Sequence, residues 1–123
     1  MPNYFFDHIH LLSQDPLKTA EFYEKMFGAA QIGKRDRGNG LVTINLNLNG
    51  TTILVSNPAS DNAQTGLDHY GIRTDNLEEA VDELKAKGVK FTREIKEMRP
   101  GFKVSFFTGP ENVSVELLQE GSI

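Results

Sequence analysis

Three side chains in the sequence can bind a divalent metal ion: two histidines in similar local sequences and one glutamate among apolar residues. His8 and His69 each follow an aspartate directly and each lies in a short apolar segment, while Glu116 interrupts the apolar run Val113–Leu118. A glutamate in an apolar strand is costly to bury unless it has a partner. Two imidazoles and one carboxylate bind borderline or hard divalent ions and leave coordination positions open. The three residue types therefore point to metal-ion chemistry.

An internal repeat places the two histidines in register. Residues 7–28 and 68–88 both begin with Asp-His, continue as a short apolar strand, reach an aspartate, and end in an amphipathic segment followed by glycine. Self-similarity of this kind indicates two copies of one structural unit. Equivalent positions in two such copies meet at a common centre when the copies are related by a pseudo-twofold axis, which favours a shared site for His8 and His69.

Each copy contains a well-marked helix. In the first copy Asp15 is a good N-cap, Pro16 suits the first helical position, and Gly28 is a natural stop. In the second copy Asp75 is the expected N-cap, and Glu78 completes a capping box. Apolar residues recur at helical spacing in both segments, so both helices are expected to cover a sheet.

Strand patterns fill the rest of each copy. Residues 41–48 alternate apolar and polar side chains, Asn49-Gly50 is a strong hairpin turn, and 51–56 follows as a strand. The second copy has strand signals at 89–95, 102–107 and 113–118. We therefore expect an α+β fold with two βαβββ modules, at about 4–56 and 67–119, joined by a linker at 57–66. The modules would form one domain over 1–123, an open, cup-shaped mixed sheet with the helices outside.

His10 adds a further candidate beside the expected site. It lies two residues after His8, and strand side chains alternate faces, so both histidines share one face. His10 is either a fourth ligand, a general acid or base beside the metal, or a histidine that only lines the pocket.

The repeat and its motifs resemble the vicinal oxygen chelate superfamily, which includes glyoxalase I, methylmalonyl-CoA epimerase, extradiol dioxygenases, fosfomycin-resistance thiol transferases and bleomycin-binding proteins. The resemblance covers about residues 5–119. The residues that carry it are Asp7-His8 followed by Asp15, Phe22-Tyr23 and Phe27-Gly28, Asp68-His69 followed by Asp75, and the turn Gly109-Pro110-Glu111-Asn112 that leads to Glu116.

The resemblance implies that His8, His69 and Glu116 are ligands of one divalent ion per site, with Fe, Mn, Ni, Co and Zn as the options. It also implies a homodimer, in which a site can draw ligands from both chains. Many family members have a fourth ligand, Glu or Gln, at the position of the first module that mirrors Glu116. Here that position falls near Leu54, which cannot ligate.

Three residues are weaker candidates for substrate binding. Arg73 shares the expected face of His69 and could hold an anionic group. Lys103 would face the site together with Ser105 if Val104 and Phe106 pack outward, and Phe107 would form an apolar wall.

Composition narrows the class of partner. The net charge of -4 and the absence of a basic stripe argue against nucleic acid or an anionic membrane. The chain has no cysteine, which excludes disulfides and thiolate ligands. The N-terminal residues do not resemble a signal peptide, so we expect a cytoplasmic protein that acts on a small molecule.

The leading interpretation is a metal-dependent lyase or isomerase that acts through a metal-stabilised enolate or alkoxide, with Glu116 or His10 moving a proton. The first alternative is an extradiol-type Fe(II) dioxygenase, because two histidines and one carboxylate also form the facial triad of such oxygenases. The second alternative is a metal-free protein that binds a small molecule or an antibiotic.

Overall fold

The computed structural model describes residues 2–60 and 63–120, which form two compact units. Unit 1 contains the residues up to Asp7 together with those from His69 onward, and unit 2 spans His8–Asp68. The boundary falls inside β1 (Tyr4–Leu12) and β5 (Gly66–Thr74), so each of these strands contributes to both units. Residues 61 and 62 of the expected linker lie outside the described residues.

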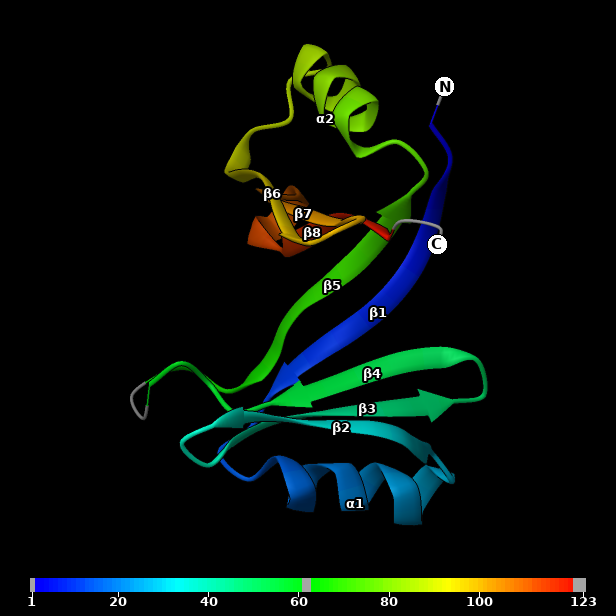
Figure 1. The fold of residues 1–123 in the computed structure, drawn as a ribbon, viewed down its shortest axis with the longest axis vertical. Coiled ribbons are helices and arrows are strands. Elements are labelled where there is room, and N and C mark those ends of the chain that lie inside the picture. The colour runs from blue at the N-terminus through cyan, green and yellow to red at the C-terminus, as the bar shows by residue number, and fades with distance from the viewer. Residues whose placement is uncertain (1, 61–62, 121–123) are drawn as a thin grey trace. The chain divides into compact units, whose positions relative to one another are not determined.

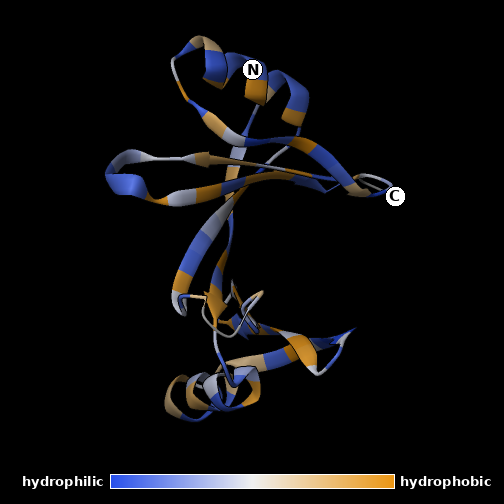
Figure 2. Ribbon diagram, turned by 90° about the vertical axis from the view of Figure 1, so that its left-hand side faces the viewer, coloured by the Kyte–Doolittle hydropathy of each residue, from blue (hydrophilic) through white to orange (hydrophobic). Residues whose placement is uncertain are grey.

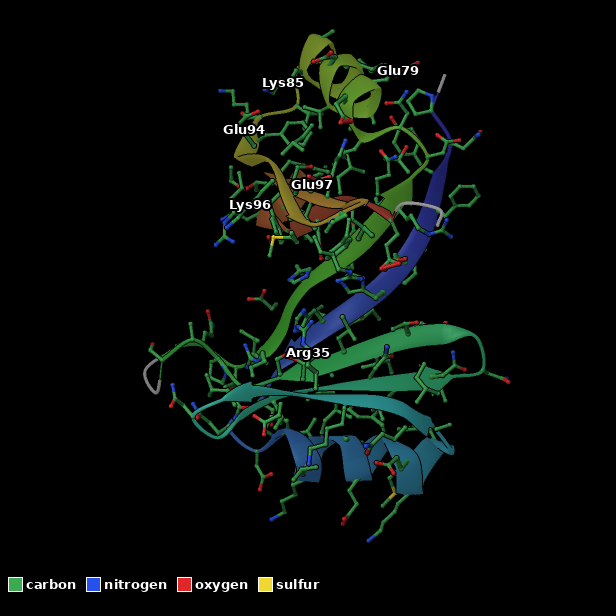
Figure 3. All side chains as sticks on the ribbon, in the orientation of Figure 1. Arg35, Glu79, Lys85, Glu94, Lys96 and Glu97 are labelled. Atoms are coloured by element: carbon green, nitrogen blue, oxygen red, sulfur yellow. The ribbon has the colours of Figure 1, made fainter. Side chains whose placement is uncertain are left out.

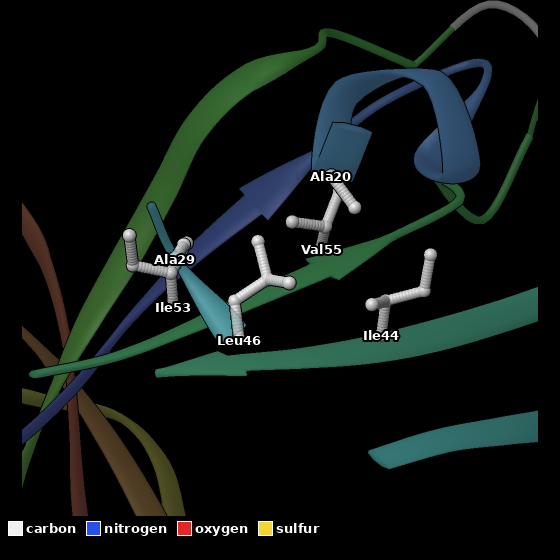
Figure 4. Close-up of a cluster of buried hydrophobic side chains, with 6 residues drawn as sticks. All are labelled: Ala20, Ala29, Ile44, Leu46, Ile53 and Val55. Carbon is white, nitrogen blue, oxygen red and sulfur yellow. The ribbon is translucent and has the colours of Figure 1, made fainter. Parts of the chain in front are cut away.

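Unit 2 is built from the second half of β1, α1 (Pro16–Phe27), β2 (Ala30–Gly38), β3 (Leu41–Leu48) and β4 (Thr51–Ser56). β1 pairs with β4 in parallel, and β3 pairs antiparallel with both β2 and β4. α1 lies along one face of these strands (Figure 1). The core between them, drawn in Figure 4, consists of Ala20, Ala29, Ile44, Leu46, Ile53 and Val55.

The first helix begins and ends where the sequence predicts. The Asp15 carboxylate accepts a hydrogen bond from the backbone N–H of Lys18, at 3.2 Å. Gly28 adopts a φ of +75°, and its N–H donates to the Glu24 carbonyl at 3.0 Å. A left-handed residue at this position is most easily supplied by glycine, which has no Cβ.

Unit 1 contains β5, α2 (Leu77–Ala86), β6 (Phe91–Arg99), β7 (Phe102–Thr108), the 3-10 turn η1 (Pro110–Asn112) and β8 (Ser114–Glu120). β5 pairs with β8 in parallel, and β7 pairs antiparallel with β6 and β8. α2 covers this sheet through a core of Leu77, Ala80, Val81 and Leu117. Lys85 of α2 and Glu94 of β6, both labelled in Figure 3, form an ion pair at 2.7 Å.

The expected N-cap of the second helix is wrong by one residue. Asn76 caps α2, because its side-chain oxygen accepts from the backbone N–H of Glu79 at 3.2 Å. The Asp75 carboxylate instead accepts from the backbone N–H and the side-chain amide of Asn3, at 3.0 and 2.8 Å. These two hydrogen bonds hold the pKa of Asp75 below its ordinary value.

The sheet is mixed and open, as expected for the α+β class. Its strands run in the order β2-β3-β4-β1 in unit 2 and β5-β8-β7-β6 in unit 1. β2 and β6 form the edges and are mostly exposed and rich in charged side chains, which discourages pairing with another sheet. Hydrophobic and hydrophilic residues are interspersed along the ribbon (Figure 2), and in β3 they alternate from Val42 to Leu48. Among the described residues no helix is long and apolar enough to cross a membrane.

Candidate metal centre

His69 of β5 and Glu116 of β8 form a buried pair in unit 1. The Nε2 of His69 lies 3.0 Å from an Oε1 of Glu116, and the two residues are 7% and 8% exposed. Strand register explains how they meet: Gly71 lies directly opposite Glu116 in the parallel pair. Because Gly71 has no side chain, the imidazole two residues before it reaches the carboxylate.

An aromatic side chain forms one wall of this pair. Phe106 of β7 lies opposite Glu116 in the antiparallel register, and its ring meets the His69 ring edge-on at 5.3 Å between centroids, with an interplanar angle of 83°. A guanidinium carbon of Arg93 lies 5.2 Å from the same Phe106 ring centroid. An apolar wall keeps the local dielectric low, which strengthens polar contacts inside it.

The face assigned to β7 from sequence is wrong. Ser105 is fully buried and donates to the Leu117 carbonyl at 3.0 Å, and Phe107 packs on the core beneath α2. Lys103 forms an ion pair with Glu78 of α2. These residues therefore occupy the helix-covered face, and Phe106, which was expected to pack outward, contacts His69 instead. The Lys103 ammonium lowers the pKa of Glu78, and the Glu78 carboxylate raises the pKa of Lys103.

Arg73 is held by two neighbours in unit 1. Its Nε lies 3.4 Å from the Asp7 carboxylate, and its guanidinium carbon lies 4.7 Å from the Phe5 ring centroid. The side chain is 44% exposed. Strand alternation puts Arg73 on the face of β5 that carries His69, four residues further along the strand. The role of Arg73 in substrate binding stays a prediction.

His8 and His10 lie together in unit 2. His8 is 5% exposed, and its ring centroid is 6.2 Å from that of His10. One ring nitrogen of each lies within 4.8 Å of the other. The Nε2 of His10 makes a hydrogen bond of 2.8 Å with the Ser56 hydroxyl, and that hydroxyl makes another of 2.9 Å with the Thr43 hydroxyl. Sequence reasoning missed the two hydroxyls, because only the register of β1, β3 and β4 brings them to His10.

The position that mirrors Glu116 is Leu54, as the sequence predicts. In unit 2 His10 lies opposite Leu54, just as Gly71 lies opposite Glu116 in unit 1. Asn45 lies opposite Leu54 on the next strand, and its buried Oδ1 makes no hydrogen bond within the described residues. The first module thus carries an imidazole, a leucine and an amide where the second carries a glycine, a carboxylate and the Phe106 ring.

Burial separates the expected ligands from the other titratable groups. Among the described residues, the buried polar side chains are His8, Ser56, His69, Thr74, Ser105 and Glu116. In this set only the two histidines and the glutamate are strong ligands for a divalent metal ion. Buried titratable groups are rare unless they are paired or functional.

The donor chemistry of the His69–Glu116 pair fits a divalent ion. The imidazole nitrogen and the carboxylate oxygen lie 3.0 Å apart, and each offers a lone pair when it is deprotonated. The same lone pairs suit Zn, Fe, Mn, Co or Ni. Such an ion would be held by both atoms in their deprotonated forms, because metal ligands must be deprotonated.

The chain is built from two βαβββ copies and carries buried histidine and carboxylate side chains that can bind a metal ion. The family model described as the Glyoxalase/Bleomycin resistance protein/Dioxygenase superfamily matches residues 5–117. The chain therefore belongs to this superfamily.

Similar proteins include enzymes of this superfamily. The chain is 26% identical over 140 residues to a lactoylglutathione lyase of Schizosaccharomyces pombe, and the match covers 96% of this chain and 46% of that protein. The chain thus spans about half the length of that relative.

Two solved structures share the fold. A hypothetical protein, BH1468 of Bacillus halodurans, matches with a TM-score of 0.79 at 21% identity, covering 98% of this chain and 96% of that one. Methylmalonyl-CoA epimerase of Mycobacterium tuberculosis matches with a TM-score of 0.74 at 18% identity, covering 96% and 88%.

Proposed function

We propose that this protein is a metal-dependent lyase or isomerase that acts on a small molecule, with the ion held by His8, His69 and Glu116. The observation that carries the proposal is the buried His69–Glu116 pair at 3.0 Å. Such a pair costs free energy to bury and contributes little net stability compared with apolar residues. A function for the pair explains why the fold keeps it.

The place of His8 in the proposal rests on the repeat. His8 and His69 follow the same Asp-His motif, and their strands pair in parallel with β4 and β8 in matching register. His8 is also among the few buried titratable residues. The family resemblance assigns this histidine to the ion together with the other two.

The chemistry divides between the ion and the protein. When bound, a divalent ion supplies Lewis-acid chemistry that stabilises negative charge on a substrate oxygen. Glu116 moves a proton to or from the substrate carbon, because it is the buried carboxylate of the site. Phe106 excludes water from the His69 side of the site, which strengthens each polar contact there. The relative named as a lactoylglutathione lyase supports this class of reaction.

Metal analysis of anaerobically purified protein tests the proposal. We expect about one divalent ion per chain, or one bound after titration with Mn, Fe, Co, Ni or Zn. Glu116→Gln should lose this binding, whereas Glu120→Gln should keep it, because Glu120 lies on the same strand but is exposed and paired with Arg99. Failure of every metal to bind would instead favour the metal-free binding protein.

The reaction class is tested with the loaded enzyme. We expect turnover of a 2-oxo or 2-hydroxy acid derivative without oxygen consumption. Substrate-dependent oxygen uptake with Fe(II) would replace the lyase or isomerase with the dioxygenase.

The homodimer is part of the same proposal. Large apolar side chains remain exposed on the first strand, with Tyr4 at 43%, Phe5 at 45% and Phe6 at 57%. Exposed apolar patches of this kind mark interaction surfaces. Light scattering should give a mass of two chains, and a mass of one chain would remove this part of the proposal.

A further inference from the structure

We infer that His10 binds the ion through its Nδ1 atom, in place of the carboxylate that the first module lacks at Leu54, and that Ser56 and Thr43 position its ring. This inference rests on the proposed function, because it adds a ligand to the same site. It goes beyond the three ligands that the repeat assigns.

The strand register of the two modules supports His10 as a ligand. In the second module the paired positions on the first and last strands hold Gly71 and Glu116. In the first module the same two positions hold His10 and Leu54. Each pair thus contains one side chain that can ligate and one that cannot. In the second module the side chain that can ligate stands on the last strand, and in the first module it stands on the first strand. Both positions lie on the same face of the sheet, because they are opposite each other in the strand register.

The hydrogen bonding of the His10 ring also supports ligation through Nδ1. Its Nε2 lies 2.8 Å from the hydroxyl of Ser56, which is 3% exposed, and that hydroxyl lies 2.9 Å from the Thr43 hydroxyl. When Nε2 carries the proton and donates it to Ser56, Ser56 donates in turn to Thr43. In this tautomer the Nδ1 atom keeps its lone pair. Metal-binding histidines are held in the same way, by a hydrogen bond from the second ring nitrogen.

The two histidines of unit 2 lie close enough to bind one ion together. Their ring centroids are 6.2 Å apart, and one nitrogen of each lies within 4.8 Å of the other. Two imidazoles on one tetrahedral ion, with bonds of about 2.1 Å, have centroids roughly 5 Å apart. A shift of about 1 Å closes the difference, which side-chain rotation within a rotamer well supplies.

The assignment separates the roles of His10 and Glu116. His10 as a ligand fixes the ion against the first module and carries no proton in the reaction. Proton transfer then belongs to Glu116. Ser56 and Thr43 are positioning residues, because they act on the ion only through the His10 ring.

The direct test uses protein with isotopically labelled histidine and a spin-active cadmium isotope. We expect a cadmium–nitrogen coupling at Nδ1 of His10, and none at its Nε2. Couplings at His8 and His69 without one at His10 would overturn this inference and leave the proposed function standing. If cadmium binds to none of the three, the proposed function fails, and this inference falls with it.

Affinity measurements with Co²⁺ give an independent test. His10→Ala should weaken Co²⁺ binding by roughly a hundredfold and Ser56→Ala by about tenfold, since partners of a ligating histidine contribute about that much. Ser13→Ala is the matched control, because the Ser13 hydroxyl bonds Thr19, away from His10. Equal affinity of all three variants with the parent would contradict the assignment.

A rescue variant separates ligation from a purely structural effect. Leu54→Glu places a carboxylate at the position that mirrors Glu116. In the His10→Ala background it should restore most of the Co²⁺ affinity and change the visible absorption of bound Co²⁺, because an oxygen replaces a nitrogen. Absence of rescue, in a variant that unfolds at the denaturant concentration of the parent, would count against a ligand at this pair of positions.

Discussion

The energetic cost of the His69–Glu116 pair can be measured with a double-mutant cycle. Glu116→Leu removes the carboxylate that lies 3.0 Å from the imidazole, and His69→Leu removes the imidazole. A hydrogen bond to a charged group contributes about 2 kcal/mol, so each single variant should lose roughly that much in the free energy of unfolding. The double variant should return to within about 1 kcal/mol of the parent, because apolar residues replace both partners.

The assay is urea unfolding in the presence of a chelator, so that no metal ion contributes. With a slope near 2 kcal/mol per molar urea, each single variant should unfold at a midpoint about 1 M below the parent. The exposed pair of Arg99 and Glu120, at 3.5 Å, is the control, and its coupling should stay below about 1 kcal/mol.

A second arm repeats the cycle with metal. At a metal concentration of a hundred times Kd the parent should gain about 2.7 kcal/mol, and the double variant should gain nothing. Losses of the two single variants that simply add in the double variant would contradict a coupled pair. In that case the two side chains would contribute separately to packing and would not form a coupled pair.

Three further predictions follow from the placement of other residues. Phe106→Ala should weaken the metal affinity measured by titration calorimetry, because the Phe106 ring contacts His69. Phe107→Ala should lower only the midpoint of unfolding. Lys103→Met should leave metal affinity unchanged, because this side chain pairs with a residue of α2; a clear loss would return Lys103 to the site. Asn3→Ala should raise the pKa of Asp75 in an NMR titration, since the side-chain amide stabilises the carboxylate. The stability lost in this variant should be largest near neutral pH, should shrink as the pH falls below the ordinary pKa of Asp75, and should vanish only below the lowered pKa that Asp75 has in the folded parent, where the carboxyl is protonated in both proteins. An unchanged pKa of Asp75 in Asn3→Ala would contradict this role of the Asn3 side-chain amide.

Turn and cap chemistry made much of the fold predictable. Asp15, Pro16 and Gly28 act through contacts within a few residues, so their sequence is enough to place α1. The alternation in 41–48 and the Asn49-Gly50 turn likewise placed β3 and β4. β2 has no alternating apolar pattern, because it is an exposed edge strand with several charged residues, and its bounds came only from the structure.

Long-range contacts were not predictable from local sequence. Asp75 and Asn76 are both good caps, and the choice between them depends on Asn3, which is 72 residues from Asp75. The Ser56 hydroxyl at the end of β4 gave no signal of its own. It reaches His10 because β1 and β4 pair in parallel, with Leu12 opposite Ser56.

The sequence by itself determined the superfamily repeat and the candidates His8, His69 and Glu116. Repeated motifs encode equivalent positions, whatever the rest of the chain does. Only the tertiary structure decided which face of β7 meets His69. In Ser105-Phe106-Phe107 the two aromatic residues stand on opposite faces, so the pattern fits either orientation. The packing of Phe107 beneath α2 leaves Phe106 beside His69, because burial against a helix, and not side-chain type, selects the face.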